Sequence, residues 1–412
     1  MFTVEGPDGK PIRVKTELYG KGLRYRARYI DPAGRERKKS FPDRAKKRAD
    51  DFLVSMESDK LRGSYIDPAA GRITFRDYAE TWLRTRVLDE SSREGTEIRV
   101  RRHLYPYFGA RQLIDIKPGN IREWDISLVD VIAPATRAVT FTHLRAILGA
   151  AVDDERIGKN PCSAKSVEPP RPDERKVVPW AHEQVRAIRA GMPSRYQPMV
   201  DIGSGCGLRQ GEIFGLAVED IDFVDGWIYV RQQVKRVRSR LVFGLPKNDK
   251  GRRVPLADAI SDVLAGHIET VPPVAVTLPW ENPASDKRVT ATLLFTTTRK
   301  NAINRSDFNP DVWHPALEQA GIERTHATGM HALRHFFASV LLDAGETVKA
   351  LAEYLGHADP GFTLRTYTHL MPASEGRTRR AIDALFRPPR KPATPWRRPR
   401  RGTVRRFRSS KP

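Results

Sequence analysis

The sequence has few cysteines, few acidic residues beside its many basic ones, and no long apolar run. Only two of its 412 residues are cysteines, Cys162 and Cys206, which excludes a disulfide framework and leaves room for one disulfide at most. This usage is typical of an intracellular protein. No apolar run approaches the length of a membrane span, and the N-terminal residues lack the apolar core of a signal peptide. We therefore expect neither a membrane anchor nor a secretion signal.

The charge balance is strongly basic. Lysine and arginine number 72 and aspartate and glutamate 50, which gives a formal net charge of +22. An excess of this size usually indicates a polyanionic partner, most often nucleic acid. The segment 387–412 holds eleven lysines and arginines and no acidic residue, so about half of the excess remains on the rest of the chain. The folded part is therefore expected to be basic as well.

Length and composition predict several globular domains. With 39% hydrophobic and 30% charged residues, the 412-residue chain can form apolar cores but is too long for one ordinary domain. The predicted fold class is mainly α with small β-sheets (α+β). Shifts in the sequence pattern divide the chain into five regions. These are a β/α module (1–65), a helical unit (66–168), a linker (169–177), a mixed α/β domain (178–386) and a disordered Pro/Arg-rich tail (387–412).

The N-terminal module is predicted to be a hairpin followed by a helix. Residues Leu23–Ile30 alternate apolar or aromatic side chains with arginines, 31–34 form a turn, and 35–41 form a second strand. A helix follows from Pro42 to about Arg62. We predict DNA contact for this hairpin, although a sheet with a basic solvent face has the same pattern. The residues proposed for this contact are Arg24, Arg26, Arg28, Lys38 and Lys39.

Four helices are predicted between residues 70 and 165. The first begins near Ile73, the third follows Lys117, and the fourth covers 135–158. The second, from Ser92 to about Pro106, is rich in arginine. Its candidate DNA contacts are Arg99, Arg101 and Arg102.

Two segments of the region 178–386, "GLRQGE" and "PKNDKGRR", suggest anion binding. Arg209 follows a glycine-rich turn near a helix start, where backbone amides and a guanidinium can bind a phosphate. Alone this signal is weak, because Arg209 could equally pair with Glu212 or Glu219. The second segment is expected to be a basic turn within a strand pair around Lys247–Arg252, and by itself it is typical of a solvated hairpin tip.

Two later segments, "HALRH" and "LGHADPGFTLRTYTHL", add histidines and a tyrosine. His331 and Arg334 are three residues apart, hence on one face of a helix. Taken alone, His331 is more often a structural histidine than a catalyst. His357 is followed ten residues later by Tyr367, in a short predicted helix. Tyr354 is the nearby alternative to Tyr367, and its position before "LGH" indicates packing.

The four segments together closely resemble the tyrosine recombinase family, also called phage-type integrases. The order and spacing of "GLRQGE", "PKNDKGRRVPL", "HALRH" and "LGHADPGFTLRTYTHL" carry this resemblance, together with "VWHPALEQAGI". It covers about 178–385. The helical unit at 70–165 resembles the core-binding (SAM-like) domain of that family, and the N-terminal hairpin with its helix resembles the arm-type DNA-binding domain of larger integrases.

The resemblance implies a site-specific recombinase that cleaves and rejoins DNA through a 3′-phosphotyrosine and a free 5′-hydroxyl. Two guanidiniums would hold the phosphate, so neither a metal nor a cofactor is expected. Lys247 would protonate the leaving oxygen, with Lys250 as the competing assignment. The residues implied as catalytic are Arg209, Lys247, His331, Arg334, His357 and the nucleophile Tyr367, with Glu212 orienting the site.

The implied partner is double-stranded DNA with attachment sites, bound by a homotetramer. An excisionase or a host DNA-bending protein would assist the reaction. Recombination would take place in the cytoplasm of a bacterial host, on its nucleoid. The reaction would integrate or excise a phage or another mobile element. The basic tail is expected to contact DNA or to have no specific function. Arg365 receives no catalytic role and is expected to lie on the surface or to contact the DNA backbone.

Two other functions have to be weighed. A type IB topoisomerase shares similar chemistry, but the arm-like module and the phrase "LGH…TYTHL" argue against it. A DNA-binding regulator derived from an integrase would have lost catalytic residues, and here all six positions are occupied.

Overall fold

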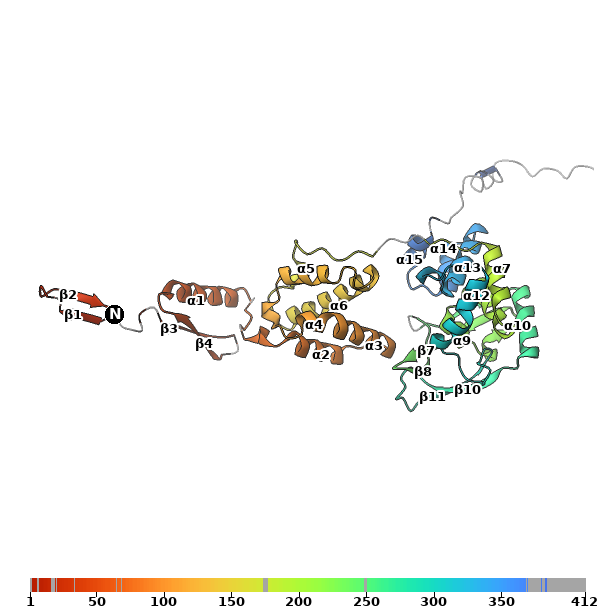
Figure 1. Cartoon of the computed structure of the whole chain (residues 1–412), viewed down its shortest axis with the longest axis horizontal. Coiled ribbons are helices and arrows are strands. Elements are labelled where there is room, and N and C mark those ends of the chain that lie inside the picture. The colour runs from red at the N-terminus through yellow and green to blue at the C-terminus, as the bar shows by residue number, and fades with distance from the viewer. Residues whose placement is uncertain are drawn as a thin grey trace, which may run out of the picture.

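The computed structural model describes residues 2–5, 7–15, 19, 21–32, 34–63, 65–67, 69–172, 177–247, 250–367, 369, 379 and 382–383. The proposed tail, 387–412, and parts of the proposed linker, 169–177, lie outside the described residues. The N-terminal part, a helical unit and the C-terminal part follow one another along the long axis of the molecule, with helices dominating and strands in small sheets (Figure 1). This confirms the predicted mainly α fold with small β-sheets. None of the described helices is long and apolar enough to cross a bilayer.

The N-terminal part contains two hairpins and a helix. Strands β3 (Leu23–Ile30) and β4 (Glu36–Pro42) pair in antiparallel register, and helix α1 (Lys46–Leu61) packs against β3. This confirms the predicted hairpin and helix. A further hairpin of β1 (Phe2–Glu5) and β2 (Pro11–Val14) precedes them. Its four-residue strands are too short to give a periodic signal in the sequence.

A helical unit follows, and an apolar cluster that includes Phe75, Phe108, Trp124 and Leu148 holds it together. The predicted second helix is present, but Val100–Leu104 forms a π-helical turn within it. The helices are α2 (Phe75–Thr85), α3 (Glu90–Arg99), α4 (Tyr105–Phe108), α5 (Pro118–Ser127) and α6 (Pro134–Asp153).

The C-terminal part builds the largest apolar cluster around α8 and α13, which pack against each other. Its helices are α7 (His182–Gly191), α8 (Gln197–Gly205), α9 (Gln210–Phe214), α10 (Asp258–Thr270), α11 (Arg305–Phe308), α12 (His314–Gln319), α13 (His331–Asp343), α14 (Val348–Leu355) and α15 (Pro360–Tyr367). Its strands are β5 (Ile221–Asp222), β6 (Trp227–Val230), β7 (Gln233–Val237), β8 (Arg240–Gly244), β9 (Arg252–Pro255), β10 (Val274–Pro279) and β11 (Arg288–Leu293).

The strand pairing around Lys247 differs from the prediction. We expected the strands before and after this lysine to pair, but β8 pairs with β7, and β9 joins β6 as the third strand of β5-β6-β9. The reason is local: Arg238 and Ser239 adopt positive φ of 46° and 67°, a two-residue turn that closes β7 on β8. Lys247 therefore lies in a connection between two separate sheets.

The helical unit contacts the C-terminal part through charged residues at the start of α3. The backbone amide of Arg238 donates to Glu94 at 2.9 Å, and the Arg238 side chain lies 3.4 Å from Glu90. Lys235 of β7 lies 3.8 Å from Asp89.

The described residues form three apolar clusters, of which the smallest includes Phe41. The domain boundaries drawn from the sequence stay a prediction.

Candidate active site

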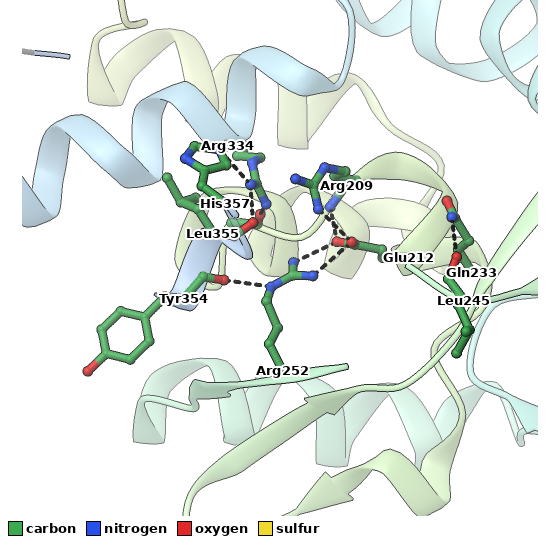
Figure 2. Close-up of polar contacts among 10 residues, drawn as sticks. Arg209, Glu212, Gln233, Leu245, Arg252, Arg334, Tyr354, Leu355 and His357 are labelled. Carbon is green, nitrogen blue, oxygen red and sulfur yellow. Dashed lines mark hydrogen bonds and ion pairs between the residues drawn. The ribbon is translucent and has the colours of Figure 1, made fainter. Parts of the chain in front are cut away.

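Helix α13 places one arginine at the centre of the site. The Arg334 side chain is fully buried. Its Nη1 donates to the carbonyl of Gly207 at 2.8 Å, and its Nη2 donates to the carbonyl of Leu355 and lies 3.1 Å from Nε2 of His357 (Figure 2). Arg334 thus joins three segments that are far apart in the sequence.

Two glycines allow these segments to approach. Gly207, in "GLR", has φ of +65°, and a Cβ there would overlap the ring of Phe337. Gly356, in "LGH", ends α14 in the left-handed conformation, and a Cβ there would lie 2.8 Å from Cδ of Arg252. Both glycines are therefore required by the backbone and by close packing, not only by flexibility.

A second arginine lies at the start of α9 and is held by Glu212. The backbone amide of Arg209 donates to Oε2 of Glu212 at 2.7 Å, and its Nη1 donates to Oε1 at 2.9 Å. Of the two carboxylates considered from the sequence, the partner is thus Glu212. The other, Glu219, instead accepts from the backbone amide of Thr292 at 3.1 Å.

A third arginine, Arg252 of β9, binds the same carboxylate of Glu212. Its Nη1 and Nη2 donate to Oε1 and Oε2 of Glu212 at 2.8 and 2.7 Å, and its Nε donates to the carbonyl of Tyr354 at 2.6 Å (Figure 2). Burial alone would raise the pKa of Glu212, but the hydrogen bonds and charge of Arg252, with the charge of Arg209, lower it to about 2. Glu212 is therefore ionised at neutral pH.

Arg209, Arg252 and Arg334, here called the arginine cluster, carry more positive charge than Glu212 offsets. Burial, together with the charges of Arg209 and Arg252, lowers the pKa of Arg334 to about 9, so it stays protonated at neutral pH. Guanidiniums bind oxyanions through planar, paired donors. The cluster is thus suited to bind an additional anion such as a phosphodiester.

His357 lies beside the arginine cluster as a neutral ring. Burial and then the charge of Arg334 lower its pKa to about 4. Because Arg334 can only donate, Nε2 of His357 accepts, and its Nδ1 therefore carries the proton and donates to Oγ1 of Thr363 at 2.7 Å. Thr363 belongs to α15, so His357 connects the arginine cluster with the helix that carries Tyr367.

Tyr367 lies at the end of α15, and its side chain is only 2% exposed. Its hydroxyl is 2.8 Å from Nδ1 of His335, one residue beyond Arg334 on α13. Burial raises the pKa of Tyr367, while the charges of Arg334 and Arg209 act in the opposite direction. The tyrosine is therefore neutral at pH 7 and lies within the electrostatic reach of the arginine cluster.

The competing tyrosine has a different orientation. Tyr354 packs against the C-terminal core and gives its backbone carbonyl to Arg252, while its ring points away from the arginine cluster (Figure 2). This agrees with a packing role.

The other candidate residues lie at the surface of the site. Lys247 and Lys250 are exposed in the connection between β8 and β9. The charge of Lys247 contributes to the lowered pKa of His357, after burial and the three arginines. His331 is exposed, and its ring centroid lies 4.8 Å from that of His335. Although His331 is exposed, enough protein surrounds its ring that desolvation, followed by the charges of His335 and Arg334, lowers its pKa.

A hollow of about 1040 Å³ opens beside the arginine cluster. Among the described residues that line it there is no acidic side chain. The basic and polar residues that face it include Arg209, Gln210, Lys235, Arg236, Arg305 and His331. A hollow of this composition is suited to a polyanion.

The residues expected to contact DNA elsewhere are only partly gathered. Arg28 and Lys38 are cross-strand partners on β3 and β4, and alternation puts Arg24 and Arg26 on the same exposed face. Lys39 lies on the other face, with its Nζ 4.5 Å from the centroid of the Phe52 ring. In the helical unit Arg101 and Arg102 are exposed, whereas Arg99 is half-buried and donates to the carbonyl of Gly95.

Two residues of the site were not among those expected from the sequence. Arg252 lies on the inward face of β9 with Val254. Because it stands two residues before this buried valine in a strand, its inward orientation could have been read from the sequence. His335 follows Arg334 directly, and its position four residues after His331 places it on the same helix side. Its contact with Tyr367 required the tertiary structure.

The structure also bears on cysteines and metals. Cys162 and Cys206 are both buried free thiols, so the one conceivable disulfide is absent. Within the part of the chain that the structure describes, no group of three or more His, Cys, Asp or Glu side chains could hold a metal ion.

Comparison with known families agrees with this geometry. A sequence profile of the phage integrase family matches residues 181–373, and a profile of the SAM-like N-terminal domain of phage integrases matches 74–128. Together the two matches span more than half of the chain. The chain belongs to the phage integrase family of tyrosine recombinases. Members of this family are site-specific DNA recombinases, and the chain is an enzyme of this kind.

Relatives of this tyrosine recombinase extend over most of its length. The integrase of prophage phiRv2 from Mycobacterium tuberculosis is 29% identical over 86% of this chain and 90% of that protein. The integrase of Mycobacterium phage L5 is 27% identical over 77% of this chain and 80% of that protein.

Solved structures of integrases share the fold. The Tn1549 transposon integrase in complex with transposon right end DNA is 21% identical, with a TM-score of 0.60 over 76% of this chain and 99% of that chain. A lambda integrase dimer bound to a core site is 15% identical, with a TM-score of 0.56 over 82% of this chain and 91% of that chain. Both neighbours are integrases bound to DNA.

Proposed function

We propose that this recombinase cleaves and rejoins DNA strands by attack of the Tyr367 oxygen on a phosphodiester, forming a 3′-phosphotyrosine and freeing a 5′-hydroxyl. The supporting observation is a buried tyrosine hydroxyl within reach of an arginine cluster whose charge exceeds that of its one carboxylate partner. A phosphodiester would supply the missing negative charge. The exchange of one ester for another conserves bond energy, so the strand can be rejoined without an energy source.

Each residue has a role that its position allows. Arg209 and Arg334 hold the non-bridging oxygens and stabilise the charge that grows on them in the transition state. Arg334 is pre-organised for this because two backbone carbonyls fix its guanidinium. Glu212 orients Arg209, and Arg252 in turn holds Glu212.

Proton transfer on the leaving side belongs to Lys247, in the connection between β8 and β9. Lys247 donates a proton to the departing 5′-oxygen, and its exposed side chain is accessible to bound DNA. His331 lines the hollow beside Arg209 and can donate a hydrogen bond to a phosphate oxygen. His357 fixes the guanidinium of Arg334 that binds the phosphate.

The test is a nicked suicide substrate that contains the attachment site. A cleaved strand loses a short 5′-hydroxyl fragment, so the covalent protein–DNA adduct accumulates and is seen as a slower band on a denaturing gel. We expect an adduct with the wild-type chain and none with Tyr367→Phe. Tyr354→Phe is the matched control and should form the adduct. An adduct that persists in Tyr367→Phe would contradict the assignment of the nucleophile.

We further propose that the enzyme works on paired attachment sites in double-stranded DNA as a homotetramer. Support comes from a neighbour of the same fold, a lambda integrase tetramer bound to a Holliday junction. The proposed divisions 1–65, 66–168 and 178–386 would then be an arm-binding, a core-binding and a catalytic domain. An excisionase or a host DNA-bending protein would set direction, and the reaction would take place on the host nucleoid in the bacterial cytoplasm. Relaxation of a plasmid that carries no attachment site would instead favour a topoisomerase.

A further inference from the structure

The activation of Tyr367 is unassigned by the roles above, because its hydroxyl is hydrogen-bonded to His335 and to none of the other five residues proposed as catalytic. In the structure the hydroxyl lies 2.8 Å from Nδ1 of His335. The ring centroids of the two residues are 5.7 Å apart and the rings are inclined by 59°. We propose that His335 accepts the phenolic proton of Tyr367 when its oxygen attacks the DNA phosphate. This inference rests on the proposed nucleophilic role of Tyr367.

The neighbouring histidines are placed less well for this task. His357 already uses both ring nitrogens, one against Arg334 and one against Thr363. His331 is exposed, and its ring is nearly perpendicular to that of His335, with the two centroids 4.8 Å apart. His335 is therefore the histidine whose ring nitrogen contacts the nucleophile.

The ring of His335 is in the form that a proton acceptor needs. Burial, followed by the charge of Arg334, lowers the pKa of His335 to about 4, so the ring is neutral at pH 7. In a neutral imidazole one nitrogen donates and the other accepts. If the tyrosine hydroxyl donates to Nδ1, the proton of the ring is on Nε2, and Nδ1 has a free lone pair aimed at the phenol.

Arg334 also provides a reason why Tyr367 is activated only on DNA. After burial, which is the larger cause, the positive charge of Arg334 lowers the pKa of His335 further, so the ring is neutral and a poor base in the free protein. A phosphodiester bound to Arg334 and Arg209 would offset that charge, so the pKa of His335 would rise and proton transfer would become easier. Substrate binding and tyrosine activation are thereby coupled through a single guanidinium.

Protons are conserved over cleavage and rejoining. The O–H bond of Tyr367 breaks and its proton moves to Nδ1 of His335, while the tyrosine oxygen forms a bond to phosphorus. The bond between phosphorus and the 5′-oxygen breaks, and Lys247 gives that oxygen a proton. In the rejoining step, Lys247 takes a proton from the incoming 5′-hydroxyl and His335 returns its proton to Tyr367. No net proton is gained or lost over the two steps.

The experiment measures single-turnover cleavage by His335→Asn on two suicide substrates, one normal and one with sulfur as the bridging 5′ atom. Asparagine places an oxygen near the position of Nδ1, so it keeps a hydrogen-bond acceptor but cannot take up a proton. The thiolate leaving group needs no protonation. We expect His335→Asn to cleave both substrates about 100-fold more slowly or worse, the range typical for loss of a general base. Lys247→Ala should be slow only on the normal substrate.

The controls separate this role from a structural one. DNA binding by gel shift should be unchanged in His335→Asn, and His267→Gln, at a buried histidine that contacts the carbonyl of Leu294, should cleave at the wild-type rate. If His335→Asn binds DNA poorly, a second variant decides. Cleavage by His335→Ala should be restored by added imidazoles, and more strongly by the more basic ones, because a free base then takes the place of the missing proton acceptor.

Three outcomes would overturn the inference. Wild-type cleavage by His335→Asn would reduce His335 to a hydrogen-bonding partner, and recovery of this variant on the sulfur substrate would place it on the leaving-group side. Failure of His335→Ala to respond to imidazoles would have the same meaning. A wild-type chain that forms no Tyr367-dependent adduct would instead refute the proposed function itself, so the two failures are distinguishable.

Discussion

The guanidinium of Arg252 and the carboxylate of Glu212 form a two-pronged ion pair, with Nη1–Oε1 and Nη2–Oε2 distances of 2.8 and 2.7 Å. The Arg252 side chain is 7% exposed and that of Glu212 is fully buried. The pair connects β9 to the start of α9, and so to Arg209. Its integrity decides where Arg209 points, which makes it the first target for mutation.

Loss of Arg252 should destabilise the protein strongly. Arg252→Ala leaves a buried carboxylate with one partner, and breaking a buried ion pair in this way costs about 3 to 5 kcal/mol. Urea unfolding followed by tryptophan fluorescence would measure this loss. The matched control is Arg253→Ala, because Arg253 is exposed on the same strand and stacks on Trp227, and an exposed contact of this kind contributes only about 0.5 to 1 kcal/mol. Equal losses in the two variants would contradict the prediction.

The contribution of Glu212 to the free energy of unfolding should depend on pH. Its folded pKa of about 2 lies below the ordinary value of 4.5, so ionised Glu212 stabilises the fold above pH 4.5. This contribution is lost as the pH falls from about 4.5 towards 2. The difference in free energy of unfolding between wild type and Glu212→Gln should therefore be largest above pH 5 and shrink towards pH 3. A difference that stays constant over this range would show that the carboxylate charge is not what stabilises the site.

The two exposed lysines of the connection between β8 and β9, Lys247 and Lys250, should differ in their effect on cleavage. If Lys247 protonates the 5′-oxygen, Lys247→Ala should slow single-turnover cleavage by about 100-fold or more. Lys250→Ala, at a lysine that is also exposed in the same connection, should remain close to wild type. The reverse pattern would move the role of general acid to Lys250.

Adjacent lysines of β4 should contribute unequally to DNA binding. Lys38 lies opposite Arg28 on the exposed face, while Lys39 sits over the ring of Phe52. If the exposed face contacts DNA phosphates, Lys38→Ala should reduce the slope of log affinity against log salt by about 0.9. Lys39→Ala should leave that slope unchanged. Titrations by fluorescence anisotropy at several salt concentrations would measure both, and equal slopes for all three proteins would refute DNA contact at this face.

Substitution of Gly207 should disturb the site without touching a charged group. Gly207→Ala introduces a methyl group where φ is +65° and where the ring of Phe337 leaves no room. Overpacking of this kind costs about 1 to 3 kcal/mol, and it shifts the carbonyl that fixes Arg334. We expect a lower melting temperature and slower cleavage. Gly321→Ala is the control, because Gly321 has a similar φ of +68° but open space around it, and it should lower only the melting temperature.

Local pattern predicted most of the elements and part of the site. Strand alternation located β3 and β4, and helical periodicity located α13 and α14, because each is stabilised by a face whose spacing is visible in the chain. The strand pairing around Lys247 was predicted wrongly. A two-residue turn of positive φ at Arg238 and Ser239 closes β8 on β7 first, and a basic segment between two strands does not by itself specify a hairpin.

The sequence by itself determined the family, the mainly α fold with small sheets, and the residues Arg209, Glu212, His331, Arg334, His357 and Tyr367 as candidates, because their order and spacing are read along the chain. Only the tertiary structure decided which atoms meet. It placed Arg252 against Glu212, and the hydroxyl of Tyr367 against His335, across separations of 40 and 32 residues. Contacts at such separations depend on how helices and strands pack around a common core, and no local propensity encodes that packing.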